Sequence, residues 1–223
     1  MIAPPSGTQR IVLLGPPASG KGTQGRRLAE ALGLGYLSTG ALLREQVENG
    51  TELGRKAAPI LDRGEYLPDD LMCPILADWL ERQRQGWVLD GFPRSMPQAL
   101  FLDGWLAGNG QALDAAVSLE VPFEVLISRI RDRVECPECR WTGQRSQLVA
   151  GDRCPDCGTP ASRRKDDDET NFRRRFNEFE ALTRPVIDHY AGAGLLRACD
   201  ATAPQDETAE RLLAALSQPK IQS

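Results

Sequence analysis

The chain has 223 residues, of which 41% are hydrophobic and 26% are charged, and its formal net charge is −4 at pH 7. This length suits one substantial core, and the composition excludes a disordered or fibrous protein. The acidic balance argues against a general nucleic-acid-binding surface, which is normally basic. The first ten residues lack an export signal and no apolar run is long enough to span a bilayer, so we expect no membrane partner and a cytoplasmic location.

Short apolar runs alternate with segments of helical period along the chain, which predicts an α/β fold with a parallel sheet flanked by helices. The expected strands are residues 11–14, 87–89, 115–121 and 195–198. The expected helices are residues 22–32, 68–85, 97–106, 123–133, 169–190 and 205–216, with Pro185 kinking or restarting the fifth. Two stretches fit this alternation poorly. Residues 39–67 suggest short helices, and residues 136–162 are rich in cysteine, glycine and proline.

A phosphate-binding loop is predicted directly after the first strand. Gly15 is followed, after four residues, by Gly20 and Lys21, and then by a segment of helical period. Such glycines let backbone N–H groups turn toward a phosphate, while the lysine supplies a cation near the β- and γ-phosphates. Gly22 stands where serine or threonine is usual, so we assign the metal-facing hydroxyl to Thr23. The alternative, a mere strand-to-helix turn, leaves Lys21 without a purpose.

Four of the six cysteines form two Cys-x-x-Cys pairs, Cys136 with Cys139 and Cys154 with Cys157, separated by fourteen residues. This spacing suits four thiolates around a structural Zn²⁺. Two local disulfides, a redox-active pair or an iron site are the alternatives. The segment has too little apolar content to fold by burial alone, which favours a metal.

Three further motifs complete a resemblance that spans nearly the whole chain. They are Ser38-Thr39-Gly40 with Arg44, the run from Leu89 to Arg94 with Gln98, and the arginines near the cysteine-rich stretch. Together with the glycine loop, they resemble the adenylate kinase family. The resemblance implies a P-loop NTPase-type core over residues 1–223, an AMP-binding helical insertion at 38–67 and a zinc-binding lid insertion at 134–168. It also implies a monomer that transfers the γ-phosphoryl group of MgATP to AMP, giving two ADP.

The resemblance assigns roles to individual residues. Those expected to act in the transfer are Lys21, Arg94, Arg133, Arg164 and Arg175. Those expected to bind ATP are Ala18, Ser19, Gly20, Lys21, Gly22, Thr23, Arg129, Arg133, Thr142, Gly143 and Ala203. Those expected to bind AMP are Thr39, Arg44, Glu65, Tyr66, Leu67, Gly91, Phe92, Pro93, Arg94, Gln98, Arg164 and Arg175. Asp90 and Thr23 are expected near Mg²⁺, and the lone histidine, His189, is assigned no chemistry.

The sequence departs from the family pattern at several positions. Ala18 stands where a loop glycine is usual, which leads us to expect a negative φ there, because a Cβ penalises the alternative. Ala203 replaces a frequent lysine, and Gly143 replaces a frequent tyrosine. The contact at Ala203 is expected to come from a backbone carbonyl.

Three other functions compete with this one. A UMP or CMP kinase would share the core and the mechanism. A zinc-ribbon nucleic-acid-binding NTPase would need a basic ribbon with exposed aromatics, whereas residues 136–157 carry one aromatic and no excess of arginine over acidic residues. A non-catalytic adenine-nucleotide sensor would be expected to lack Lys21 or some of the arginines, and this chain retains them.

Overall fold

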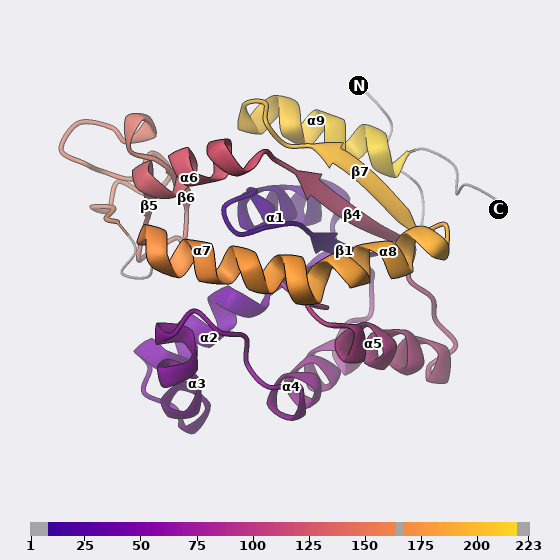
Figure 1. Ribbon diagram of the computed structural model, residues 1–223. Coiled ribbons are helices and arrows are strands. Elements are labelled where there is room, and N and C mark those ends of the chain that lie inside the picture. Colours follow the sequence, from indigo (N-terminus) through magenta and orange to yellow (C-terminus); the bar gives the residue numbers. More distant parts are fainter. Residues whose placement is uncertain (1–8, 164–166, 218–223) are drawn as a thin grey trace.

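A computed structural model describes residues 9–163 and 167–217 of the protein (Figure 1). Its centre is a five-stranded sheet in the order β2-β3-β1-β4-β7, and each neighbouring pair is parallel. The strands are β1 (Arg10–Leu14), β2 (Gly35–Ser38), β3 (Trp87–Asp90), β4 (Ala115–Glu120) and β7 (Leu196–Asp200). The expected parallel sheet is therefore confirmed, with one strand that was not predicted.

That strand, β2, forms one edge of the sheet and pairs only with β3. It is four residues long, and only one of its residues is fully buried. A short, half-exposed strand that begins with glycine carries almost no periodic signal, since its conformation comes from pairing with residues far along the chain.

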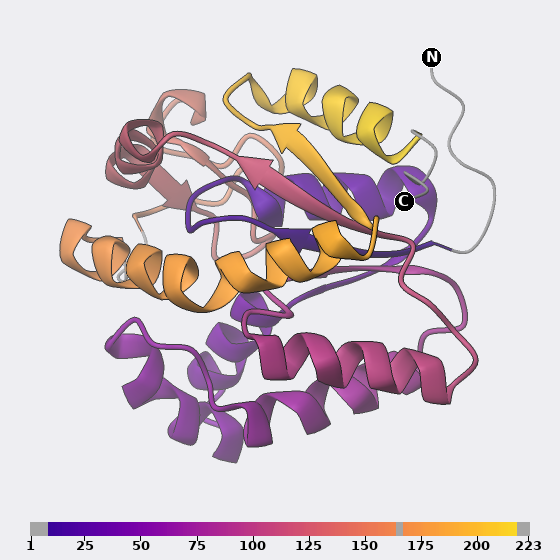
Figure 2. The ribbon, with the colours of Figure 1, turned by 45° about the vertical axis from the view of Figure 1, so that its right-hand side comes forward.

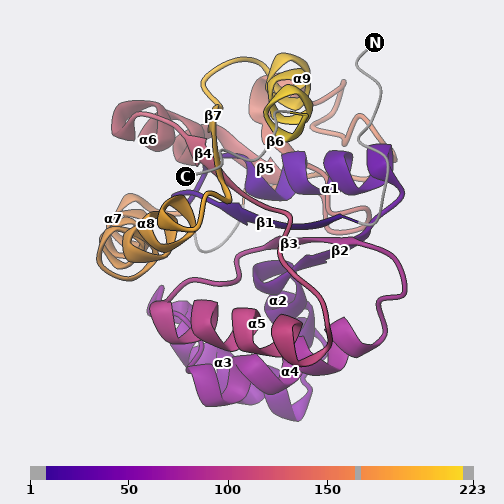
Figure 3. The same ribbon diagram turned by 90° about the vertical axis from the view of Figure 1, so that its right-hand side faces the viewer.

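Helices cover both faces of the sheet, which is why the central strands are apolar throughout. On one face lie α1 (Lys21–Leu32) and α9 (Gln205–Leu216), and on the other lie α4 (Asp69–Glu81), α5 (Met96–Gly108) and α8 (Arg184–Gly192). The side chains of β1 alternate between these layers. Ile11 and Leu13 join the core below α1 and α9, whereas Val12 and Leu14 join the core below α4, α5 and α8. Figure 3 shows the two layers edge-on.

Two segments project from this sandwich. Residues 38–67, the helical segment, contain α2 (Thr39–Glu48) and α3 (Glu52–Asp62), which confirms the expected short helices. Each begins at a hydroxyl cap, because Ser38 accepts a hydrogen bond from the N–H of Ala41 and Thr51 accepts one from the N–H of Gly54.

Residues 134–168, of which the structure describes 134–163 and 167–168, form the cysteine segment, which follows α6 (Phe123–Asp132). An antiparallel pair, β5 (Arg133–Glu135) with β6 (Thr142–Gln144), and the short helix η1 (Arg145–Gln147) provide its regular structure.

The long helix predicted over residues 169–190 is interrupted. It consists of α7 (Glu169–Glu178), a π-helical turn η2 (Phe179–Thr183) and α8, which follow one another along nearly one line (Figure 2). Pro185 lies at the start of α8. At a helix start, the missing N–H of proline and the clash of its ring with the preceding turn are best accommodated. The predicted restart at Pro185 is thus confirmed. In the described ranges, no helix combines the length and apolar character needed to cross a membrane.

Candidate functional site

A cleft opens at the carboxyl ends of the parallel strands. The strand β1 pairs with β3 on one side and with β4 on the other, so the connections diverge at this point, and ligands of open α/β sheets bind at such a point. The register places the end of β1 next to Asp90, and Asp90 next to Ser38 of β2. The cleft has a volume of about 880 Å³ and lies between the glycine loop, the helical segment and the cysteine segment.

The glycine loop connects β1 to α1 and supplies a buried cation. The Nζ of Lys21 donates hydrogen bonds to the carbonyl oxygens of Gly15 at 2.7 Å and Pro16 at 2.8 Å. Burial lowers the pKa of Lys21 to about 8, although the nearby carboxylate of Asp90 opposes this effect. The ammonium is therefore held at the loop by weak carbonyl acceptors that a phosphate group can replace.

The backbone of this loop corrects one expectation. Ala18 has a φ of 64°, in the left-handed region, and not the negative φ that its side chain led us to expect. Gly20, which precedes α1, also has a positive φ, of 97°. The turn therefore imposes on an alanine a conformation that glycine favours, at the energetic cost of its Cβ.

The carboxylate of Asp90, which is only 7% exposed, lies at the end of β3 and receives a hydrogen bond from a residue that the sequence did not indicate. The hydroxyl of Tyr36 lies 3.3 Å from Oδ2 of Asp90 and 3.2 Å from the carbonyl oxygen of Gly22. Tyr36 belongs to the unpredicted edge strand β2, so no local pattern could place it beside Asp90. Burial raises the pKa of Tyr36, so the hydroxyl keeps its proton.

Arginines of α1, α2, α6, β5 and α7 and of two loops line the cleft. Arg133 forms an ion pair with the fully buried side chain of Asp167, which holds its guanidinium in place. Arg94 donates from Nε to the carbonyl oxygen of Gly91 at 2.6 Å, and its guanidinium stacks on the ring of Tyr66. Arg129 donates to the carbonyl oxygen of Ala201 at 2.6 Å. This cluster provides the dispersed positive charge that binding of phosphate groups requires.

Most of the predicted nucleotide-binding residues line the cleft. They are Ala18, Ser19, Gly20, Lys21, Gly22, Thr23, Arg44, Tyr66, Asp90, Gly91, Pro93, Arg94, Arg129, Arg133, Thr142, Gly143, Arg175 and Ala203. Five others are not part of its lining, namely Thr39, Glu65, Leu67, Phe92 and Gln98. Arg164 lies outside the described residues.

The five residues outside the lining differ in environment. Thr39 and Gln98 are buried behind the wall of the cleft, 2% and 3% exposed, and Thr39 donates to the carbonyl oxygen of Gly91 at 2.8 Å. Leu67 and Phe92 are buried in the core, whereas Glu65 pairs with Arg63 at the surface.

The cysteine segment contacts the first two turns of α1, directly after the glycine loop. Oγ1 of Thr23 lies 3.5 Å from the carbonyl oxygen of Thr142, and a guanidinium nitrogen of Arg26 lies 3.2 Å from that of Cys139. At position 143 an added Cβ would lie 2.4 Å from the ring of Trp141. Trp141 therefore fills the space that a larger residue at this position would need, and it lines the cleft itself.

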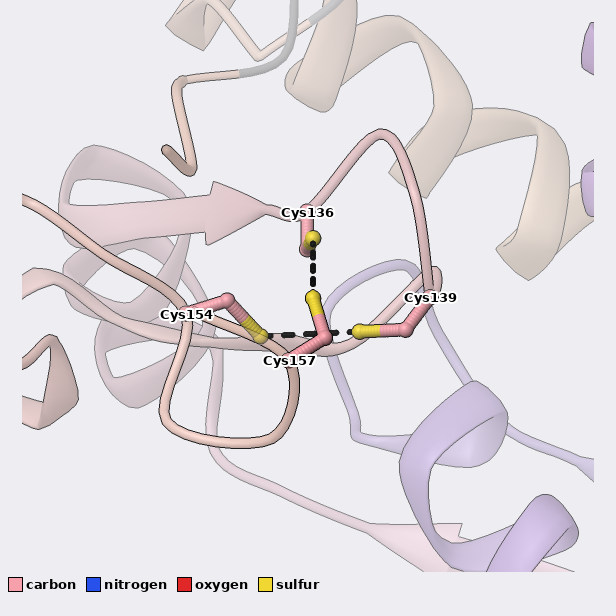
Figure 4. Close-up of side chains that lie close together, drawn as sticks. All are labelled: Cys136, Cys139, Cys154 and Cys157. Carbon is pink, nitrogen blue, oxygen red and sulfur yellow. Dashed lines mark hydrogen bonds between the residues drawn. The ribbon is translucent and has the colours of Figure 1, made fainter. Parts of the chain in front are cut away.

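The four predicted metal ligands converge on one point (Figure 4). Their sulfur atoms all lie within 4.8 Å of one another, and two pairs, Cys136 with Cys157 and Cys139 with Cys154, are 3.5 Å apart. Tetrahedral zinc with Zn–S bonds of about 2.3 Å requires sulfurs roughly 3.8 Å apart, whereas a disulfide requires about 2.05 Å. All six cysteines are free, so the donor set fits Zn²⁺ and not two local disulfides.

Comparison with known proteins agrees with this geometry. The sequence model of the family described as adenylate kinase matches residues 13–195. The chain belongs to the adenylate kinase family. The adenylate kinase of Lachnospira eligens is 37% identical to it, over 89% of this chain and 95% of its own length. That of Kosmotoga olearia is 39% identical, over 91% of this chain and 96% of its own length. That of Thermotoga maritima is 38% identical, over 91% of this chain and 94% of its own length. Membership of the adenylate kinase family makes the protein a nucleotide kinase.

Proposed function

We propose that this protein catalyses the reversible transfer of the γ-phosphoryl group of MgATP to AMP, which gives two ADP. The observation that carries the proposal is the convergence of Lys21 with Arg94, Arg129 and Arg133 on one cleft at the glycine loop, in a member of the adenylate kinase family. In this reaction an oxygen of the AMP phosphate forms a bond to the γ-phosphorus while the bond from that phosphorus to the β,γ-bridging oxygen breaks. The negative charge on the transferred group remains spread over its oxygens.

Positioning and charge neutralisation account for nearly all of the catalysis in such a transfer. Lys21 and the loop N–H groups are proposed to hold the β- and γ-phosphates of ATP, and Arg94 and Arg44 the phosphate of AMP. Arg133 and Arg175 are proposed to act on the group in transit. No general base is needed, because a phosphate monoester with a second pKa of about 6 already presents an oxyanion near neutral pH.

Magnesium and zinc have different proposed roles. Mg²⁺ would neutralise phosphate charge, and Asp90 and Thr23 are the residues proposed to hold it. Zinc at Cys136, Cys139, Cys154 and Cys157 is proposed to be structural, because four protein thiolates leave no open position. The cysteine segment is proposed to act as a lid that excludes water from the cleft, since water would otherwise accept the phosphoryl group.

Two properties of the molecule in the cell complete the proposal. Metal-binding thiolates persist in a reducing compartment, so we place the protein in the cytoplasm. Within the described residues, the lining of the cleft brings together the predicted nucleotide-binding residues of one chain, which supports a monomer as the active form.

A coupled assay tests the proposal directly. Purified protein with MgATP is supplied in turn with AMP, GMP, UMP and CMP, and diphosphate formation is measured for each. ADP formed selectively from AMP is the expected result, and Lys21→Ala should lower kcat by at least about a hundredfold. Arg84→Gln, which changes an exposed arginine before β3 that is not part of the cleft lining, serves as the control. Transfer only to a pyrimidine nucleotide would keep the fold and replace the substrate.

A further inference from the structure

The side-chain amide of Gln98 is held by two hydrogen bonds that fix its orientation. Its Oε1 accepts from the backbone N–H of Arg94 at 2.8 Å, and its Nε2 donates to Oδ1 of Asp69 at 2.6 Å. A backbone N–H can only donate and a carboxylate can only accept. Turning the amide over would therefore set donor against donor and acceptor against acceptor. Because Gln98 is only 3% exposed, little water can compensate for such a mismatch.

Asp69 is itself held in place by the start of the neighbouring helix. It is the first residue of α4, and its Oδ2 receives a hydrogen bond from the hydroxyl of Ser95 at 3.3 Å. Ser95 caps α5 by accepting from the backbone N–H of Gln98. The carboxylate thus joins the beginnings of α4 and α5, which pack side by side (Figures 1 and 3).

We propose that Asp69 is a positioning residue that fixes the orientation of the Gln98 amide, and so determines where its Oε1 and its Nε2 meet the base of the nucleotide that accepts the phosphoryl group. This orientation favours adenine over a 6-oxopurine. The proposal rests on the proposed function and on the AMP-binding role expected for Gln98, which lies behind the lining of the cleft in this structure and must be reached by the base when AMP binds. One lone pair of Oε1 already accepts from Arg94 and one N–H of Nε2 already donates to Asp69. The amide therefore retains one further lone pair on Oε1 and one further N–H on Nε2 for the base. Adenine offers a 6-amino donor beside the N1 acceptor, which matches this pair.

A 6-oxopurine presents the reverse pattern, an acceptor at position 6 beside an N1–H donor. Binding it through Gln98 requires the flipped amide, which the carboxylate of Asp69 and the N–H of Arg94 both oppose. Of the two, only Asp69 can be altered by substitution, because the other group is backbone. An asparagine at this position can turn either its oxygen or its NH₂ toward Gln98, and it therefore removes one of the two barriers to the flip.

The test compares AMP with inosine monophosphate, which has the 6-oxo pattern without the additional 2-amino group of GMP. We expect the wild-type enzyme to prefer AMP, and Asp69→Asn to lower the AMP:IMP ratio of kcat/KM by about tenfold, the scale of one hydrogen bond to a charged group. The change should appear mainly in KM. Asp70→Asn is the matched control, because it removes an exposed carboxylate from the same first turn of α4 and should leave the ratio unchanged.

Several results would overturn the proposal. One is an unchanged AMP:IMP ratio in folded Asp69→Asn, which includes an equal loss for both nucleotides, the result that a purely structural role predicts. A wild-type enzyme that does not distinguish AMP from IMP would also overturn it. Absence of ADP from wild-type enzyme with AMP would instead show that the proposed function itself has failed. If Asp69→Asn does not fold, Asp69→Ser permits the same comparison.

Discussion

The guanidinium of Arg140 forms an ion pair with the carboxylate of Glu48, and this contact joins the cysteine segment to α2 of the helical segment. Arg140 follows Cys139 and has a φ of 59°, whereas Gly158, which follows Cys157 at the same place in the other Cys-x-x-Cys turn, has a φ of 75°. The two turns have the same geometry, but one carries an arginine where the other has the glycine that this conformation favours. The side chain of Arg140 thus comes at a cost in backbone energy.

Replacing Arg140 by glycine should weaken the binding of AMP without lowering the free energy of unfolding. Arg140→Gly relieves the backbone penalty and is expected to keep or raise the free energy of unfolding, by up to about 1 kcal/mol. It also removes the ion pair that joins the cysteine segment to α2 of the helical segment, the segment expected to bind AMP. A partly exposed pair contributes about 0.2–1 kcal/mol, so KM for AMP should rise by up to about fivefold. Chemical denaturation and steady-state kinetics measure the two effects.

Glu48→Gln provides the matching change on the other partner of the Arg140–Glu48 pair. It should raise KM for AMP by a similar factor, and the double variant should be no worse than either single one. Glu52→Gln, which changes an exposed carboxylate at the start of α3 in the same segment, is the control. Additive losses in the double variant would show that the two residues act independently.

The pKa of Lys21 predicts how ATP affinity depends on pH. Phosphate groups favour the protonated ammonium, so they bind best when that proton is already present. Below the pKa of about 8 the affinity should be constant, and above it binding requires proton uptake, so affinity should fall by up to about tenfold per pH unit. Titration calorimetry with a non-hydrolysable ATP analogue between about pH 7 and pH 9.5 measures this.

Lys21→Arg is the control for that experiment, because arginine stays charged across the whole pH range. Its affinity for the analogue, whatever its absolute value, should not fall above pH 8. A wild-type affinity that is the same at both ends of the range would contradict the lowered pKa of Lys21.

Removing zinc should loosen the cysteine segment and leave the core folded. Cys136→Ser eliminates one of four ligands, and the free energy of metal binding is also what folds a segment with so few apolar residues. We expect zinc content to fall and trypsin to cut faster at the arginines of this segment, while far-UV circular dichroism changes little. Cys73→Ser, in α4, is the control. An intact zinc content in Cys136→Ser would exclude the four-thiolate site.

The sequence was sufficient to predict those features that depend only on residues close together in the chain. The glycine loop after β1, the cysteine pairs and the interruption before Pro185 are all read from neighbouring residues. Sequence reasoning missed features that arise from pairing across the chain. Strand β2 exists because it pairs with β3, and Tyr36 matters because that pairing brings it to Asp90. The contact of Asp69 with Gln98 likewise joins residues 29 positions apart.

Ala18 shows the limit of reasoning from residue type. An alanine in place of a glycine suggested a negative φ, yet the turn that presents the loop to the cleft gives it a φ of 64°. Substitution by glycine distinguishes the two conformations by the sign of its effect. At a negative φ, Ala18→Gly should destabilise the protein by about 0.4–1 kcal/mol, because glycine adds conformational freedom to the unfolded chain. At the positive φ it also relieves a Cβ penalty of about 1–2 kcal/mol, so the net effect should be stabilising.

Equilibrium denaturation of Ala18→Gly measures this sign, and Ala18→Val provides the opposite change, because a β-branched side chain strongly disfavours the left-handed region. Ala18 also packs against the cluster that contains Leu126, Ile127 and Phe172, so glycine loses part of one methyl contact and the gain should be below about 1 kcal/mol. Stabilisation by glycine together with destabilisation by valine would establish that the loop holds Ala18 in the glycine conformation. Destabilisation by glycine would instead restore the negative φ expected from the sequence.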